Sequence, residues 1–444
     1  MSDLGLEVIP SARRLMESLR DIGYDLPAAV ADLVDNSLDA DALRVDVDLT
    51  HDDHGGWVRI ADDGLGMTER ELDEAMRYGS SRSYRKRDLG SFGLGLKTAS
   101  LSQCRSLTVA TRSTVGGPIR VRRWDLDRVA RTDAWELERL AGRSAPPQAL
   151  EPLDDGTGTV VLWQRPDRIL GTRRVEGDAA ARRLEGAAQE IATHLAMVFH
   201  RFLAGEATGP RVALHVNGRE LGPWDPFARD EKMTRRLRPQ MLTLEHSEES
   251  HEVAVQPWIL PAQHHFSSGE AHERAAGPKR WNRQQGLYIY RSDRLVQSGG
   301  WNRLRTLDEH SKLARIALDI PVGADDAFRT NVSKMTVALP DALRAPLRAL
   351  VAGVAGSAQD IYRRRVTAVP DLERSEKSAS SPDTALSVGD QWPHLVEVLT
   401  TELGDQVNVL DRVLVALANL APPRGLEDKP SDQMLAKAYH RRRL

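Results

Sequence analysis

Four short motifs rich in Asp, Gly and Thr follow one another between residues 31 and 162 of this 444-residue chain. In order they read ADLVDNSLDA from Ala31, IADDGLGM from Ile60, GSFGLGLKT from Gly90 and DGTGTVVL from Asp155. The set spans about 130 residues, which is within the usual size of one domain. Each motif is weak as an isolated string, so their order within one domain constrains this region more than any single motif does.

The first motif reads as a helix with three polar side chains on one face. Asp32, Asn36 and Asp39 stand four and three residues apart, a spacing that places them together on a helix. A carboxamide oxygen one turn from a carboxylate suits Mg²⁺, which takes oxygen ligands and keeps several waters. A carboxylate on the same face can orient or deprotonate an attacking water. Taken alone, the motif is equally well explained as a solvated acidic helix face.

The second and fourth motifs place polar groups at the ends of strands. Gly64 and Gly66, followed by Met67, let the backbone turn sharply and approach a flat ligand. Asp62, just before them, can accept a hydrogen bond from the exocyclic amine of an adenine. Thr159 enters a strand, where it can bind a ligand or a water. For each string alone, an ordinary turn and an ordinary strand residue are the simpler explanations.

The third motif opens a helix with Gly90, Gly93 and Gly95. Glycines at a helix start can present amide groups to phosphates, helped by the helix dipole. The string is not a nucleotide-binding loop of the G-x-x-x-x-G-K-[ST] type, because Leu96 stands where that loop needs its lysine and Lys97 follows one residue late. A glycine-rich turn that caps a core helix is the alternative.

Interleaved helices and strands predict an α+β fold with more than one domain. The expected domains are an α/β sandwich over 1–165, a second α+β domain over 166–345, and a helical tail over 346–444 with a linker near 369–391. Hydrophobic periodicity predicts the individual elements. The expected strands are 45–49, 58–60, 107–111, 119–121, 159–162, 212–216, 287–290 and 316–320, and the expected helices are 11–19, 26–38, 69–78, 184–202 and 395–417.

Composition excludes several classes of protein. Sixty-one Lys and Arg residues against 64 Asp and Glu give a net charge of −3, which excludes a strongly basic nucleic-acid coat but allows a local basic groove. The single cysteine, Cys104, excludes an intramolecular disulfide and a cysteine-built zinc site. No run approaches the roughly 18 apolar residues of a membrane span, and the N-terminus lacks a signal peptide. We therefore expect a cytoplasmic protein with no membrane partner.

The order of the four motifs resembles the GHKL ATPase superfamily of gyrase B subunits, heat-shock chaperone ATPases, histidine kinases and MutL. The first and third motifs look most similar to MORC-type and MutL-type members. The resemblance implies a Bergerat-type ATPase sandwich that uses ATP and Mg²⁺, with the loop 79–89 as a lid. It places Asp32 at the general base and Asn36 at the Mg²⁺ ligand. It places Asp62 at the Asp that reads adenine, with Gly64, Gly66 and Met67 beside it and Thr159 near adenine. The segment that contacts the phosphates would consist of Gly90, Gly93, Gly95, Leu96 and Lys97.

One position departs from the family pattern. The family usually has Glu where this chain has Asp32, so the carboxylate stands one methylene further back. Asp35 is a rival carboxylate, but three residues on it should point partly aside. The resemblance therefore implies slow hydrolysis, with an ATP-binding switch of negligible turnover as the alternative.

The second region looks like the transducer (S5-like) domain that follows the ATPase in MutL and MORC proteins. The resemblance rests on residues 216–219 and 286–295, and it implies a lysine that reaches the γ-phosphate when the domains close. Lys334 is the best match. Only nine of the 61 basic residues are lysine, so a lysine inside a motif is weak evidence that an ammonium is specifically needed there.

By analogy with those relatives, ATP binding closes a homodimer that acts on DNA as a clamp, with residues 1–24 exchanged between subunits. The basic segments 235–238, 363–365 and 441–443 can hold phosphates, although charge runs are usually solvated faces. The apolar stripe of a helix over 394–420 is a candidate docking site for a protein partner. A chaperone-type ATPase is the alternative enzyme. A histidine kinase is disfavoured, because no His precedes Asp32.

Overall fold

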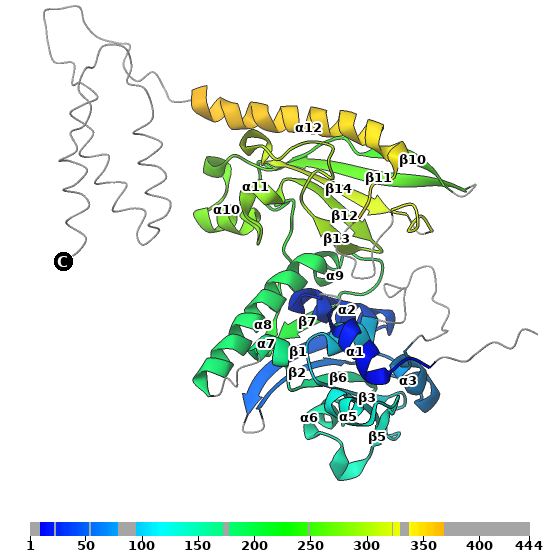
Figure 1. Cartoon of the computed structure of the whole chain (residues 1–444). Coiled ribbons are helices and arrows are strands. Elements are labelled where there is room, and N and C mark those ends of the chain that lie inside the picture. The colour runs from blue at the N-terminus through cyan, green and yellow to red at the C-terminus, as the bar shows by residue number, and fades with distance from the viewer. Residues whose placement is uncertain are drawn as a thin grey trace, which may run out of the picture. The chain divides into compact units, whose positions relative to one another are not determined.

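The computed structural model describes residues 9–21, 24–52, 55–78, 95–171, 177–246, 249–321, 323–328 and 337–367. The chain divides into two compact units, residues 1–370 and 371–444, and every described residue belongs to the first unit. Two sheets organise the described elements of that unit (Figure 1).

The first sheet has eight described strands in the order β5-β4-β3-β6-β2-β1-β7-β8. Neighbouring strands are antiparallel except for β1 and β7, which are parallel. The strands are β1 (Arg44–Asp52), β2 (Gly55–Asp62), β3 (Ser106–Arg112), β4 (Arg120–Asp125), β5 (Glu138–Leu140), β6 (Gly158–Gln164), β7 (Ala213–Val216) and β8 (Arg219–Glu220). This sheet continues past residue 165, where the sequence predicts that the first domain ends. The three domain boundaries stay predictions.

Local sequence explains where the helices on this sheet begin. The side chain of Asp25 caps α2 by accepting from Ala28 N at 2.8 Å, and Pro27 occupies the first turn. Thr68 and Glu71 form a capping box at α3. The helices are α1 (Ala12–Arg20), α2 (Leu26–Asp39), α3 (Glu69–Met76), α4 (Gly95–Leu101), α5 (Leu126–Thr132), α6 (Pro147–Leu150), α7 (Asp167–Leu170), α8 (Asp178–Val198) and α9 (His200–Ala204), with 3₁₀ turns η1 (Gly142–Ser144) and η2 (Glu151–Leu153). α2 packs against α4 and α8, and α8 packs against β1 and β7.

The second sheet has the strand order β10-β11-β14-β12-β13, with β9 paired to β11. Its strands are β9 (Arg235–Arg236), β10 (Gln240–His246), β11 (Glu249–Ile259), β12 (Gly286–Arg291), β13 (Arg294–Ser298) and β14 (Ala314–Ile320). The helical elements beside it are η3 (Gln263–His265), α10 (Gly269–Ala276), α11 (Arg280–Gln284), η4 (Glu309–Ser311) and α12 (Asp341–Thr367). α12 lies along this sheet and contacts β10, β11 and β14 (Figure 1).

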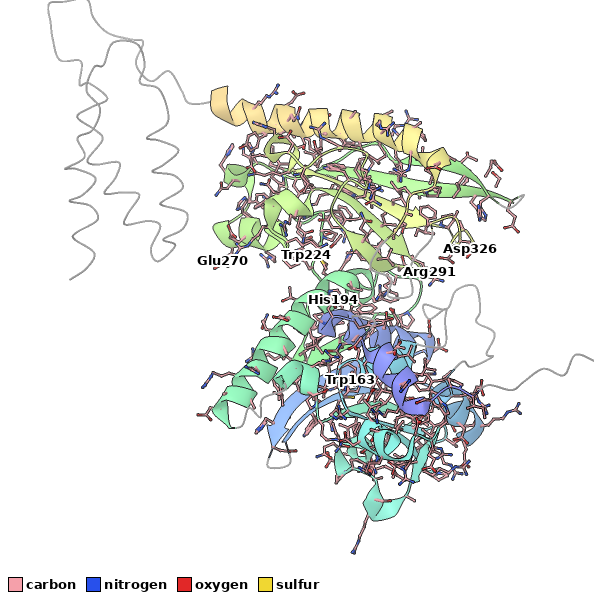
Figure 2. The ribbon with its side chains drawn as sticks, in the orientation of Figure 1. Trp163, His194, Trp224, Glu270, Arg291 and Asp326 are labelled. Carbon is pink, nitrogen blue, oxygen red and sulfur yellow. The ribbon has the colours of Figure 1, made fainter. Side chains whose placement is uncertain are left out.

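Buried apolar side chains form two clusters on the first sheet and one on the second, and the larger cluster of the first sheet includes side chains of the second sheet. Trp163, in β6, is among the largest fully buried side chains of the first cluster (Figure 2). Tyr288, Tyr290 and Leu295 of the second sheet belong to that same cluster. Strands β12 and β13 therefore pack into the core of the first layer, which brings their side chains close to α2.

The α+β fold class is confirmed, and each expected strand and the first four expected helices occur. The sequence analysis missed the β10–β11 hairpin, whereas most of α12 lies at the start of the expected helical tail over 346–444. Although Val253, Val255 and Ile259 alternate as buried residues in β11, Pro257 interrupts the pattern, and proline argues against a central strand. Among the described helices, none is both long enough and apolar enough to cross a membrane. The expected helix over 395–417 and the linker lie outside the described residues.

Candidate active site

Asp62, the last residue of β2, is held by hydrogen bonds from three directions. Its Oδ1 accepts from Gly64 N at 3.0 Å and from Thr159 N at 3.1 Å, and its Oδ2 accepts from Ser37 Oγ at 2.9 Å. Burial raises the pKa of Asp62 above its ordinary value, and the three hydrogen bonds act in the opposite direction. Asp62 and Thr159 are direct partners in the β2–β6 ladder. The Ser37 bond ties this strand end to α2 and the Thr159 bond ties it to β6, so three of the four sequence motifs meet at one carboxylate.

The glycine turn after Asp62 packs too closely for a side chain. Gly66 has φ +65°, and a Cβ there would come within 2.1 Å of Arg112 O. Gly158 has φ +146°, and a Cβ there would come within 1.9 Å of Asp62 O. A Cβ at Gly64 would approach Ala40 O to 2.7 Å. Contact between backbones thus requires glycine at positions 64, 66 and 158, whereas a Cβ at Gly156 would meet nothing within 4 Å.

Thr111, at the end of β3, was missed by the sequence analysis and joins these two motifs. Its Oγ1 accepts from Met67 N at 2.8 Å, donates to Gly158 O at 2.8 Å and lies 3.2 Å from Thr159 Oγ1. The available signal was that Thr111 ends a predicted strand. A threonine in a strand is common, so that signal does not single it out.

The polar residues of α2 differ sharply in exposure. Asp32 is buried, with 5% of its surface exposed, and Asp35 is fully buried. Asn36 and Asp39 are exposed. The helix face predicted from the sequence therefore has a buried carboxylate, Asp32, and one turn later an exposed carboxamide, Asn36.

Arg294, the first residue of β13, contacts both buried carboxylates of α2. Its Nε donates to Asp35 Oδ1 at 2.7 Å, and its Nη2 lies 3.5 Å from Asp32 Oδ1. The sequence analysis missed Arg294, because 259 residues separate it from Asp35. The phenol of Tyr24 also lies beside Asp32, and burial and then the Asp32 charge raise the pKa of Tyr24 above its ordinary value.

Lys97, in α4, is buried with 1% of its surface exposed, and its Nζ donates to Ala75 O at 2.8 Å. Burial lowers the pKa of Lys97 to about 8. Gly95 is the first residue of α4, and Leu96 beside it is half-buried. The role of Lys97 at a phosphate stays a prediction. The predicted site residues Gly90, Gly93 and Lys334, with the loop 79–89, lie outside the described residues.

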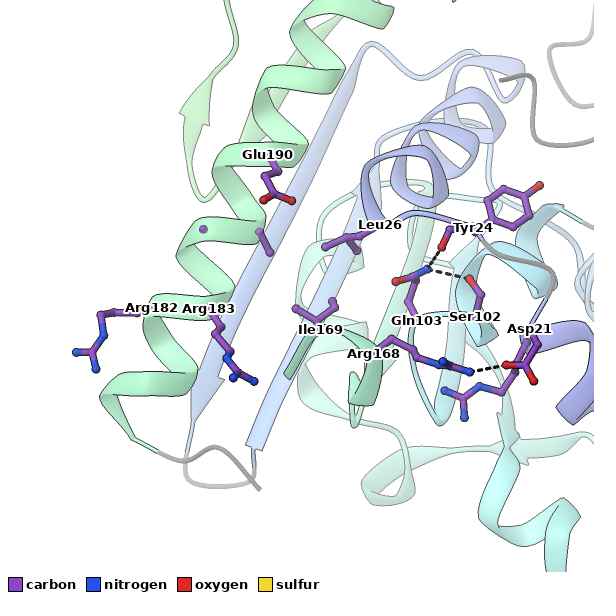
Figure 3. A pocket seen from close by; sticks show the side chains of 13 residues that line it. Asp21, Tyr24, Leu26, Ser102, Gln103, Arg168, Ile169, Arg182, Arg183 and Glu190 are labelled. Atoms are coloured by element: carbon purple, nitrogen blue, oxygen red, sulfur yellow. Dashed lines mark hydrogen bonds and ion pairs between the residues drawn. The ribbon is translucent and has the colours of Figure 1, made fainter. Parts of the chain in front are cut away.

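A cavity of about 630 Å³ lies between the start of α2, the end of α4, α7 and α8 (Figure 3). Several of its charges are already paired, since Arg168 binds Asp21 at 2.6 Å and Arg20 binds Asp167 at 2.6 Å. Gln103 donates from the cavity wall to the backbone oxygen of Tyr24 at 2.9 Å. Asp32, Asn36 and Asp62 do not line this cavity.

The donor set on α2 and β2 fits a nucleotide with Mg²⁺. Asn36 offers an exposed amide oxygen of the kind that Mg²⁺ takes, on the same helix as the carboxylate of Asp32. Asp62 offers a carboxylate that its neighbours hold in place and that can accept from an amine. Among the described residues, no cluster of three or more His, Cys, Asp or Glu could hold a metal. A metal that is bound mainly through an amide oxygen, water and phosphate needs no such cluster.

Comparison with known proteins agrees with this geometry. The family described as histidine kinase-, DNA gyrase B- and HSP90-like ATPase matches residues 24–157. The chain is 36% identical over 87 residues to ATPase morc-1 of Caenorhabditis elegans (19% of this chain, 10% of the relative) and 43% identical over 96 residues to the DNA mismatch repair protein MutL of Shewanella amazonensis (20% and 14%). Human ATPase MORC2 is 37% identical over 78 residues (16% and 8%). The chain thus matches only a small share of these relatives, and its N-terminal region, residues 24–157, belongs to the histidine kinase-, DNA gyrase B- and HSP90-like (GHKL) ATPase family.

Proposed function

We propose that this chain binds ATP with Mg²⁺ and hydrolyses it slowly. The observation that carries the proposal is the hydrogen bond from Ser37 to Asp62, because it joins the helix that bears Asp32 and Asn36 to the strand end that bears the candidate adenine reader. The family match over residues 24–157 covers all of these positions.

Each residue has a distinct role in this proposal. Asp62 accepts from the exocyclic amine of adenine, and Thr159 lies beside it. Asn36 holds Mg²⁺, which would neutralise charge on the phosphates when bound. Asp32 orients and deprotonates the attacking water. Its side chain is one methylene shorter than the Glu that the family usually has, so we expect a low turnover number.

The direct test is phosphate release by the purified chain with ATP and Mg²⁺. We expect slow release that Asp32→Asn lowers by about 100-fold or more, with ATP affinity changed less than about threefold. Asn36→Ala should instead weaken Mg²⁺ binding, so that hydrolysis needs a higher Mg²⁺ concentration. Protein that binds ATP and Mg²⁺ but releases no phosphate, even with DNA present, would contradict hydrolysis.

That outcome would favour a second function, an ATP-binding switch without turnover. The burial of Asp32, with 5% of its surface exposed, favours this candidate, because a buried carboxylate is less accessible to an attacking water. A chain of this kind would respond to ATP by changing shape or partner and would not need to release phosphate.

We also propose that ATP binding closes a homodimer around DNA, with Lys334 reaching the γ-phosphate. Support comes from the MutL and MORC matches and from the exposed basic residues Arg235, Arg236 and Arg238. Light scattering with and without a non-hydrolysable ATP analogue tests closure. A dimer that forms only with the analogue supports the clamp, and a constant monomer rejects it. Absence of DNA binding at low salt with the analogue would reject the DNA role.

A further inference from the structure

A single arginine of the second sheet reaches the helix that carries the candidate general base. Arg294 begins β13, and its Nε donates to Asp35 Oδ1 at 2.7 Å while its Nη2 lies 3.5 Å from Asp32 Oδ1. The side chains of Arg294, Asp35 and Asp32 are 5%, 0% and 6% exposed. One guanidinium therefore faces two carboxylates, away from water.

The two contacts differ in strength. The Asp35 contact has the length of a charge-assisted hydrogen bond, so it anchors the guanidinium to α2. The Asp32 contact is at the outer limit of a hydrogen bond, so small movements of Arg294 change it most. The guanidinium carbon of Arg294 lies over the ring of Phe199, 5.7 Å from the ring centroid, so the ring limits the positions open to the guanidinium.

His194, a titratable residue near Arg294, does not substitute for its charge at neutral pH. His194 lies in the same surroundings (Figure 2), and burial and then the Arg294 charge lower its pKa to about 4. His194 is therefore neutral at pH 7. Arg294 therefore supplies a positive charge from the second sheet that contacts Asp32.

We propose that Arg294 is a positioning residue that sets the orientation of Asp32 and makes hydrolysis depend on where the second sheet lies. β13 pairs with β12, and β12 pairs with β14, so a displacement of the second sheet moves the guanidinium with it. A retained contact holds Asp32 in the orientation that hydrolysis needs. A loosened contact releases Asp32 from that orientation. This inference rests on the proposed ATPase activity.

The structure supplies a matched control on the same sheet. Arg201, in α9, binds Asp319 of β14 with an Nη2 to Oδ2 distance of 3.2 Å, and its Nη1 lies 3.2 Å from Asp293 Oδ1. Like Arg294, it links a helix of the first layer to the second sheet through an ion pair. Asp319 and Asp293 lie outside α2, so loss of the Asp319 carboxylate removes an ion pair between the layers while the contacts of Arg294 with α2 stay in place.

The test compares steady-state ATP hydrolysis by the full chain and by the variants Arg294→Gln, Arg294→Lys and Asp319→Asn, with thermal unfolding of each. We expect Arg294→Gln to lower kcat by about tenfold or more, as misplacement of a catalytic group does. KM for ATP should change less than about threefold, because Asp62 reads adenine. Arg294→Lys keeps the charge but loses the planar fork, so kcat should fall less, by about threefold to tenfold. Asp319→Asn should leave kcat within about twofold of the original chain.

The outcomes separate this inference from the proposed function. An original chain without ATP hydrolysis rejects the proposed activity, and the inference falls with it. An active original chain whose Arg294→Gln and Asp319→Asn variants have equal kcat values rejects the inference alone. Where Arg294→Gln fails to fold, Arg294→Lys decides. A folded Lys variant with reduced kcat and unchanged KM supports positioning. A Lys variant with the original kcat, or one that also fails to fold, shows that Arg294 acts only in stability.

Discussion

The two ends of the candidate site are built in different ways. At the Asp62 end, backbone donors from Gly64 and Thr159 and the hydroxyl of Ser37 hold the carboxylate, all within one layer of the fold. At the Asp32 end, a side chain from a second sheet makes one strong and one weak contact. A carboxylate held by its own strand and helix is fixed whenever that layer is folded. A carboxylate contacted from another sheet depends on that sheet's position. Under the proposed function, adenine recognition therefore stays constant while hydrolysis depends on the position of the second sheet.

The largest expected effect tests the buried ion pair at the Asp32 end. Arg294→Met should destabilise the chain by about 3–5 kcal/mol, because the buried Asp35 carboxylate loses its guanidinium. The double variant Asp35→Asn with Arg294→Met removes both charges and should recover much of that loss. Urea unfolding of the single and double variants measures both free energies. If the single and the double variant lose equal free energy of unfolding, Asp35 does not depend on Arg294. The Asp32 end would then not depend on the second sheet in the way proposed.

The next effect tests whether the Asp62 end reads the base. Asp62→Asn should weaken ATP binding by about 100-fold, or about 2.7 kcal/mol, since a neutral amide is a poorer acceptor for the adenine amine. The control is Asp63→Asn, because the exposed Asp63 accepts from Leu43 N and Arg44 N on the outer side of the same turn. Calorimetric titration gives both affinities. If the two variants bind ATP equally well, Asp62 is a structural residue and the Asp62 end does not recognise adenine.

A smaller effect tests the hydroxyl that supports the glycine turn. Thr111→Val should cost about 1–2 kcal/mol, because Met67 N and Gly158 O both lose a partner. Thr108 lies on the same strand and is also fully buried, and its Oγ1 has no hydrogen-bond partner among the described residues. Thr108→Val should therefore be neutral or stabilising. Unfolding curves of the two variants compare them directly, and equal costs would mean that the Thr111 hydroxyl does not support the turn.

Local spacing was enough to predict the Asp62 end but not the Asp32–Arg294 contact. Asp62, Gly64 and Gly66 lie within five residues, and a turn after a strand follows from glycine and aspartate chemistry over that distance. Arg294 meets Asp35 across 259 residues, and only the packing of two sheets brings them together. The burial of Asp35 has the same origin, because helix spacing gives the direction of a side chain relative to its neighbours and not what covers it.

The last prediction concerns the charge of the buried Lys97, whose effect on stability changes with pH in a direction that its pKa fixes. The folded pKa of Lys97 is about 8, below its ordinary value of 10.5, so the unfolded chain binds more protons than the folded chain between these two pH values. The Lys97 contribution to stability must therefore rise as pH increases from about 8 to about 10, by at most about 1.4 kcal/mol per pH unit. Unfolding of the original chain and of Lys97→Met at pH 7.5 and 9.5 measures the difference.

Lys279→Met is the control for this measurement. Burial also lowers the pKa of Lys279, whose Nζ donates to Ser298 O in the second sheet. Without nucleotide, each variant should lose the part of the pH trend that its own lysine supplies to the original chain. If Lys97 contacts phosphate, then saturating ATP with Mg²⁺ raises its pKa and reduces the trend for Lys97 only. A trend that ATP leaves equally steep for both lysines would assign Lys97 to packing between α3 and α4, and it would leave phosphate contact to other residues of the site.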